Sequence, residues 1–190
     1  SKGRAGTPAG QSCSSRNAAT SRCLRATAYV SCALGCPYEG DIDPQKVLDL
    51  SRELLAMGCY EVSISDTIGI AGAGDCKRML DVVCSELPVS KLAVHYHDTY
   101  GQALANILQS LQMGIATIDS SVAGLGGCPY AKGATGNVAT EDVVYLLNSL
   151  GIQHGIDLDK LIAAGNQISQ QLDRPTNASV ARAINAKRSC

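Results

Sequence analysis

The stretch "HYHDTYGQALAN" (residues 95–106) places two of the chain's three histidines, His95 and His97, one residue apart. Alternate residues of a β-strand share a face, so a strand here would point both imidazoles to the same side. Two convergent imidazoles are good ligands for a divalent metal ion, although two ligands underfill a site and oxygen ligands must come from elsewhere. The alternative is a structural pair of half-buried strand histidines, and the spacing alone leaves both interpretations open.

Two aspartates lie at comparable junctions. Asp98 follows the histidine pair and is expected to orient one imidazole through a hydrogen bond. Asp66, in "SDTIG", comes where a strand is expected to end, and it is either a cap at a helix entry or a catalytic carboxylate. The nearby "AGAG" (71–74) is either a plain turn or a phosphate-binding helix start.

The glycine-rich segment "AGLGGCPYAKGATGN" (123–137) carries Cys128 near its centre. It does not match the phosphate loop GxxxxGK[ST]. A long loop at the mouth of a barrel is a candidate lid, and a thiol in a lid can carry a proton once closure changes its pKa. An ordinary reduced cysteine is the alternative.

Short strand patterns alternate with helix patterns from Ala26 onward. Asp43, Pro44 and Gly58 mark the start and end of the first helix, as a cap, a first-turn proline and a terminating glycine. Strands are expected at 27–34, 60–65, 92–97 and 116–121, and helices at 43–58, 75–86, around 104–111, 140–150 and 158–172.

This alternation predicts right-handed parallel βα units, in either a (β/α) barrel or a doubly wound sheet. A full eight-stranded barrel needs about 250 residues, and only four strands are evident, so the fold class is α/β and the architecture is half of a TIM barrel, with the first half missing. In a barrel the chemistry lies at the carboxyl ends of the strands. Polar residues gather at these expected strand ends: Asp66, His95, His97, Asp98, Asp119 and Ser121.

Composition excludes several classes of function. The net charge of −1 gives no electrostatic footprint for nucleic acid, and no apolar run approaches the 18 residues of a membrane span. The nine cysteines include no CxxC pair, which argues against a structural zinc site or a disulfide framework.

Residues 1–25 contain five basic and no acidic residues, as in a transit-peptide remnant or a disordered, non-homologous segment. We therefore divide the chain into this segment, a barrel part at 26–172 and a polar tail at 173–190.

The segment "SVAGLGGCPYAKGATGN", together with "HYHDTYGQALAN", "SDTIG" and "VSCALGCPYEG", resembles the 3-hydroxy-3-methylglutaryl-CoA (HMG-CoA) lyase family from about Tyr29 to Leu172. The resemblance implies a TIM barrel that cleaves HMG-CoA to acetyl-CoA and acetoacetate. This reaction ends leucine breakdown and forms ketone bodies in the mitochondrial matrix, and the full-length enzyme is expected to be a homodimer. Related acyl-CoA condensing enzymes carry Gly-Glu-Arg where this chain has "GGCPYAKG".

The resemblance also implies roles for single residues. His95, His97 and Asn137 match ligands of a divalent cation, Mg²⁺ or Mn²⁺, and the catalytic positions are matched by Cys128, Asp66 and Glu141. The family's first strand carries a metal-binding aspartate and a catalytic arginine, and residues 1–25 show no such pattern. The alternative function is therefore an inactive fragment, or an isoform that associates with a complete subunit.

Overall fold

The computed structural model describes residues 25–127 and 136–188. Its centre is a parallel sheet of four strands in the order β1-β2-β3-β4. The strands are β1 (Thr27–Val30), β2 (Glu61–Asp66), β3 (Leu92–Tyr96) and β4 (Thr117–Asp119). Neighbours in the chain are neighbours in the sheet, as in one continuous arc of a (β/α) barrel, so the α/β class and the partial-barrel architecture are confirmed.

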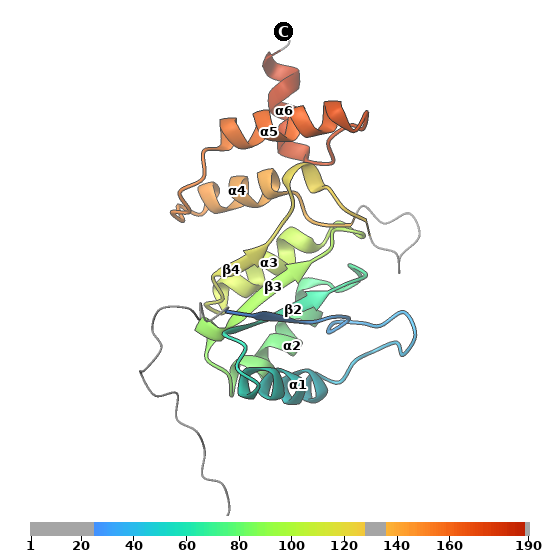
Figure 1. Ribbon diagram of the computed structural model, residues 1–190, viewed down its shortest axis with the longest axis vertical. Helices are drawn as coiled ribbons and strands as arrows, with labels where there is room; N and C mark the ends of the chain where they lie inside the picture. Colours follow the sequence, from blue (N-terminus) through green and yellow to red (C-terminus); the bar gives the residue numbers. More distant parts are fainter. Residues whose placement is uncertain (1–24, 128–135, 189–190) are drawn as a thin grey trace, which may run out of the picture.

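Three helices follow the first three strands and cover one face of the sheet (Figure 1). They are α1 (Pro44–Ala56), α2 (Ala73–Cys84) and α3 (Ala103–Gln112). Two short 3₁₀ helices, η1 (Val89–Lys91) and η2 (Val122–Gly124), lie just before β3 and after β4. Asp43 caps α1 by accepting a hydrogen bond from the backbone N–H of Gln45 at 3.0 Å, and Gly58 ends the helix with φ +102°, as the sequence predicts.

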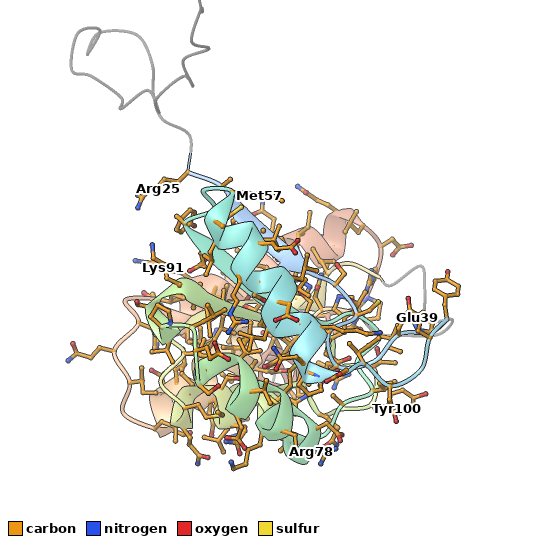
Figure 2. All side chains as sticks on the ribbon, turned by 90° about the horizontal axis from the view of Figure 1, so that it is seen from below. Arg25, Glu39, Met57, Arg78, Lys91 and Tyr100 are labelled. Carbon is orange, nitrogen blue, oxygen red and sulfur yellow. The ribbon has the colours of Figure 1, made fainter. Side chains whose placement is uncertain are left out.

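The main core lies between the sheet and these helices. Side chains at alternate positions of the strands, such as Val62, Ile64 and Val94, are fully buried against Leu48, Leu80 and other helix residues. Except for the exposed Leu50, the face of α1 away from this core is mostly polar. In Figure 2, Arg78 of α2 and Lys91 of η1 lie on the outside of the molecule. The alternating apolar side chains of the strands determine which face of the sheet packs against the helices. The opposite face of the sheet is left for polar groups.

The first strand is shorter than expected. We predicted a strand over 27–34, but β1 ends at Val30, because Cys32 adopts a left-handed conformation with φ +57°. The backbone N–H of Cys32 then donates to Thr67 Oγ1 at 2.7 Å. The chain therefore turns across the end of β2 instead of continuing along it.

The C-terminal part forms a second layer of helices, α4 (Thr140–Ser149), α5 (Leu158–Gln171) and α6 (Ser179–Arg188), beyond β4 (Figure 1). The segment expected to be a polar tail thus contains a helix. Its buried residue Ala181, together with Ala178 just before the helix, packs with Ile162 of α5. The buried stripe consists mainly of alanines, so the hydrophobic signal in the sequence is weak. No described helix is long and apolar enough to cross a membrane.

Candidate metal site

His95 and His97 lie together at the carboxyl end of β3. Their ring centroids are 5.3 Å apart with an interplanar angle of 55°. The Nδ1 atoms of both rings are buried and lack a hydrogen bond that satisfies normal geometry. Burial and the nearby His95 lower the pKa of His97, so a neutral imidazole, the form that binds metal, is favoured. The rings converge as the sequence predicts.

Asn137 reaches the same place from the far end of the glycine-rich segment. It forms an isolated bridge with His97, and its side-chain Nδ2 donates to the carbonyl of Leu125 at 2.9 Å. With the nitrogen committed to Leu125, the side-chain oxygen is the atom suited to a cation. Gly126 makes this approach possible, since a Cβ there would lie 2.5 Å from Asn137 Nδ2.

The described residues contain no group of three or more His, Cys, Asp or Glu side chains that could hold a metal ion. Two convergent imidazoles and one amide oxygen nevertheless fit a hard or borderline divalent ion, as part of a larger ligand set. The donor chemistry is therefore compatible with Mg²⁺ or Mn²⁺ but supplies no carboxylate ligand by itself.

Asp66 is fully buried and acts as an anchor for the loop after β2. Its carboxylate accepts hydrogen bonds from the backbone amides of Gly69, Ile70 and Ala71, at 3.0, 3.3 and 3.0 Å. Burial raises the pKa of Asp66, and these amides oppose that rise. The geometry favours the cap over a freely reacting carboxylate, and the backbone carbonyl of Asp66 also accepts from His97 N–H at 3.2 Å.

The "AGAG" segment leads into α2 but already has a negative partner. Asp75 in the first turn accepts from the backbone N–H of Gly72 at 2.9 Å. A carboxylate at a helix N-terminus occupies the place that a phosphate would take. The plain-turn interpretation of this segment is therefore favoured.

Glu141 is also fully buried, at the start of α4. Both carboxylate oxygens lie 3.0 Å from the backbone nitrogen of Ala123 in η2. Burial raises the pKa of Glu141. Its contacts hold the chain just beyond β4, next to the segment that leads to the glycine-rich loop.

Asp98 uses its carboxylate to cap α3, accepting from the backbone N–H of Ala103 at 3.0 Å. The carboxylate found beside a site histidine is that of Asp119 on β4, whose Oδ2 lies 3.4 Å from His95 Nδ1. The sequence placed Asp119 among the polar strand ends but gave it no role, because strand register is not visible in the sequence.

Cys128, the expected catalytic thiol, lies outside the described residues.

A parallel βα arc with a histidine pair at its carboxyl edge defines the class: a partial (β/α)-barrel protein with a polar site at the strand ends. The chain belongs to the HMGL-like family, whose sequence model matches residues 11–168. This match begins at residue 11, inside the basic segment 1–25 that we expected to lie outside the barrel part.

The named relatives are lyases. The chain is 61% identical over 160 residues to the human cytoplasmic 3-hydroxy-3-methylglutaryl-CoA lyase, covering 84% of this chain and 43% of that protein. It is 59% identical over 166 residues to the mouse mitochondrial hydroxymethylglutaryl-CoA lyase, covering 87% and 51%. Both compartments therefore occur among similar proteins. The chain spans about half the length of the curated relatives that it matches.

Solved structures agree with this assignment. The Pseudomonas aeruginosa hydroxymethylglutaryl-CoA lyase matches with a TM-score of 0.84 and 58% identity, covering 86% of this chain and 54% of that chain. The Acinetobacter baumannii HMG-CoA lyase, solved in complex with coenzyme A and 3-methylmalate, matches with a TM-score of 0.77 and 36% identity, covering 83% of this chain and 52% of that chain. The carboxyl transferase domain of Rhizobium etli pyruvate carboxylase, at 21% identity and a TM-score of 0.56 over 73% of this chain and 23% of that one, shares the fold alone.

Proposed function

We propose that this chain supplies one half of a hydroxymethylglutaryl-CoA lyase, a carbon–carbon lyase. This half carries the histidine pair and the glycine-rich loop. The observation that carries the proposal is the convergence of His95, His97 and Asn137 at the carboxyl ends of the strands. The reaction is the cleavage of HMG-CoA to acetyl-CoA and acetoacetate. The similarity to named lyases supports this substrate class.

The proposed site divides its tasks among the chain's own residues. His95, His97 and Asn137 hold the cation, Mg²⁺ or Mn²⁺, which when bound polarises the substrate's oxygens. A base takes the proton of the C3 hydroxyl, the C2–C3 bond breaks, and an acid protonates the acetyl-CoA enolate. Cys128 is proposed as a proton carrier in this sequence.

Asp66 and Glu141 enter the proposal as anchors of the segments around the site. The carboxylate of Asp66 is committed to three backbone amides, and its carbonyl fixes the backbone of His97. The carboxylate of Glu141 is committed to Ala123. Each therefore affects the reaction by holding the backbone near the site.

The test uses a hybrid protein, the lyase chimaera, in which residues 26–188 replace the matching part of the Pseudomonas aeruginosa lyase. With HMG-CoA and Mg²⁺ or Mn²⁺ it is expected to form acetoacetate. His95→Ala and His97→Ala should abolish that activity, whereas His154→Ala, at a half-buried histidine that hydrogen-bonds Asn148, should leave it unchanged. A folded chimaera without metal-dependent turnover would refute the proposed function.

A second candidate is an inactive isoform that associates with a complete subunit. Within the described residues, β1 and β4 each have only one neighbour in the sheet, and unpaired edge strands invite pairing with another chain. The 190-residue chain alone should show no measurable lyase activity. Turnover by this chain within about tenfold of the chimaera would count against the second candidate.

Location and assembly are part of the proposal. We place the protein in the mitochondrial matrix, as a homodimer when the barrel is complete, with no nucleic-acid or membrane partner. The mitochondrial relatives support this location, and the cytoplasmic relatives are the competing case. Subcellular fractionation with an antibody to the chain distinguishes them.

A further inference from the structure

Asp119 and His95 are direct neighbours across two strands. In the parallel ladder between β3 and β4, His95 is the register partner of Asp119, so both side chains project from the same face of the sheet. Asp119 Oδ2 lies 3.4 Å from His95 Nδ1. That separation is long for a hydrogen bond, and the ring nitrogen has no well-formed partner in this state. A small rotation of the ring would bring the atoms to the roughly 2.8 Å of a charge-assisted bond.

Other groups hold the Asp119 carboxylate in place. Ser63 Oγ on β2 donates to Asp119 Oδ2 at 3.3 Å. This bond crosses β3 at Ala93, which pairs with Ser63 on one side and with β4 on the other, and the small alanine side chain leaves space for it. Tyr29 on β1 also hydrogen-bonds Asp119. The carboxylate is therefore supported from two further strands.

The same tyrosine also restricts the imidazole. The rings of Tyr29 and His95 meet edge to face, with centroids 5.8 Å apart and an interplanar angle of 85°. The Asp119 carboxylate faces this ring, so it can accept a hydrogen bond from a ring nitrogen that carries a proton. The Asp119 carboxylate is thus an oriented acceptor, and the His95 ring is held on one side by Tyr29. The Nδ1 atom of His95, which lacks a well-formed hydrogen bond, lies between them.

We propose that Asp119 is a positioning residue that holds His95 in the tautomer with the proton on Nδ1, leaving Nε2 to bind the cation. This inference rests on the proposed function, because it assumes that His95 is a metal ligand. Metal-bound histidines commonly donate their second ring N–H to a carboxylate, which fixes the tautomer and orientation of the ring. Ser63 and Tyr29 in turn orient that carboxylate.

The first measurement needs neither metal nor substrate. The metal-free lyase chimaera is labelled with ¹⁵N-histidine, and the imidazole signals are recorded near pH 8, where an ordinary imidazole is neutral. A His95→Gln variant assigns the signals of His95. In the parent His95 should be protonated at Nδ1. In Asp119→Ala and Asp119→Asn this preference should be lost, while the signals of His97 keep their pattern.

The second measurement is Mn²⁺ affinity by calorimetry. Loss of a carboxylate that supports a metal-bound histidine typically weakens metal affinity by about 10–100-fold, and this loss is expected for both Asp119 variants. Asp43→Asn is the matched control, since this exposed aspartate only caps α1, and its Mn²⁺ affinity should equal that of the parent. Far-UV circular dichroism confirms that each variant is folded.

The outcomes separate this inference from the proposed function. An unchanged His95 tautomer together with Mn²⁺ affinity within about threefold of the parent overturns the positioning role, whatever the lyase activity of the parent. A shifted tautomer with weakened Mn²⁺ binding supports it. If the parent binds Mn²⁺ in this way but forms no acetoacetate, the proposed function fails and the role of Asp119 stands.

Discussion

Replacing Gly165 by alanine tests the contact that holds α5 to the site. Gly165 lies on the buried face of α5, and a Cβ there would lie 2.4 Å from Glu141 Oε1. Val122 Cγ1 and Ala123 Cβ, at 3.5 and 3.6 Å, close the space around it. The substitution must therefore move either the Glu141 carboxylate or the helix.

Two opposing effects set the magnitude. Alanine is the better helix former, by up to about 1 kcal/mol. Against this, overpacking a buried contact costs about 1–3 kcal/mol, and loss of a hydrogen bond to a charged group, here from Ala123 to Glu141, costs about 1.5–3 kcal/mol. The clash wins, and Gly165→Ala should lower the free energy of unfolding by about 1.5–5 kcal/mol. For a chain of this size that lowers Tm by at least about 3 °C.

The matched control is Gly74→Ala at the start of α2. A Cβ there meets only Arg78 Nη1, at 3.7 Å, so the free energy of unfolding should stay the same or rise by up to about 1 kcal/mol. Both variants are compared with the parent chimaera by urea unfolding followed by circular dichroism. If Gly165→Ala is as stable as the parent, Glu141 and α5 are not packed as the structure describes.

Two further predictions concern buried titratable groups. Burial raises the pKa of Glu141 above its ordinary 4.5, so between 4.5 and the raised pKa the native state binds more protons than the unfolded state, and the contribution of Glu141 to stability grows as pH falls through that window. The unfolding free energy of the parent minus that of Glu141→Gln should therefore increase on going from pH 7 to pH 5. A difference that does not change with pH would contradict the burial of Glu141. Burial also raises the pKa of the fully buried Cys76 thiol, so in native protein at pH 8 peptide mapping should find Cys76 unmodified by iodoacetamide while the partly exposed Cys59 is alkylated, and equal labelling would refute this.

Much of the α/β framework was predictable because its signals are local. The aspartate cap, the first-turn proline and the final glycine of α1 are read from adjacent residues, and the structure confirms each. The pairing of His95 with His97 on one face follows from the two-residue period of a strand. No partner distant in the chain is needed for these inferences.

The errors and omissions occur where distant residues decide the structure. The first strand stops at Val30 because Cys32 bonds Thr67, 35 residues later. The last helix, α6, begins where the carboxylate of Asp142 accepts from the backbone amides of Ser179 and Val180, at 3.1 and 2.8 Å. Neither contact leaves a pattern in the local sequence, so the sequence suggested a longer strand and a tail.

The same distinction explains why residue type alone did not separate the roles of the carboxylates. Asp66, Asp98 and Asp119 all follow or end strands; the sequence suggested a cap or a catalytic group for Asp66, a partner of a histidine for Asp98 and no role for Asp119. The structure separates them by their partners: Asp66 and Asp98 accept from backbone amides of the next turn, whereas Asp119 faces an imidazole and two hydroxyls from three other strands. A carboxylate committed to amides stabilises its own loop, whereas one shared among side chains on several strands can set the orientation of a ligand. Strand register, which brings Asp119 opposite His95, is what turns an ordinary aspartate into a candidate positioning group.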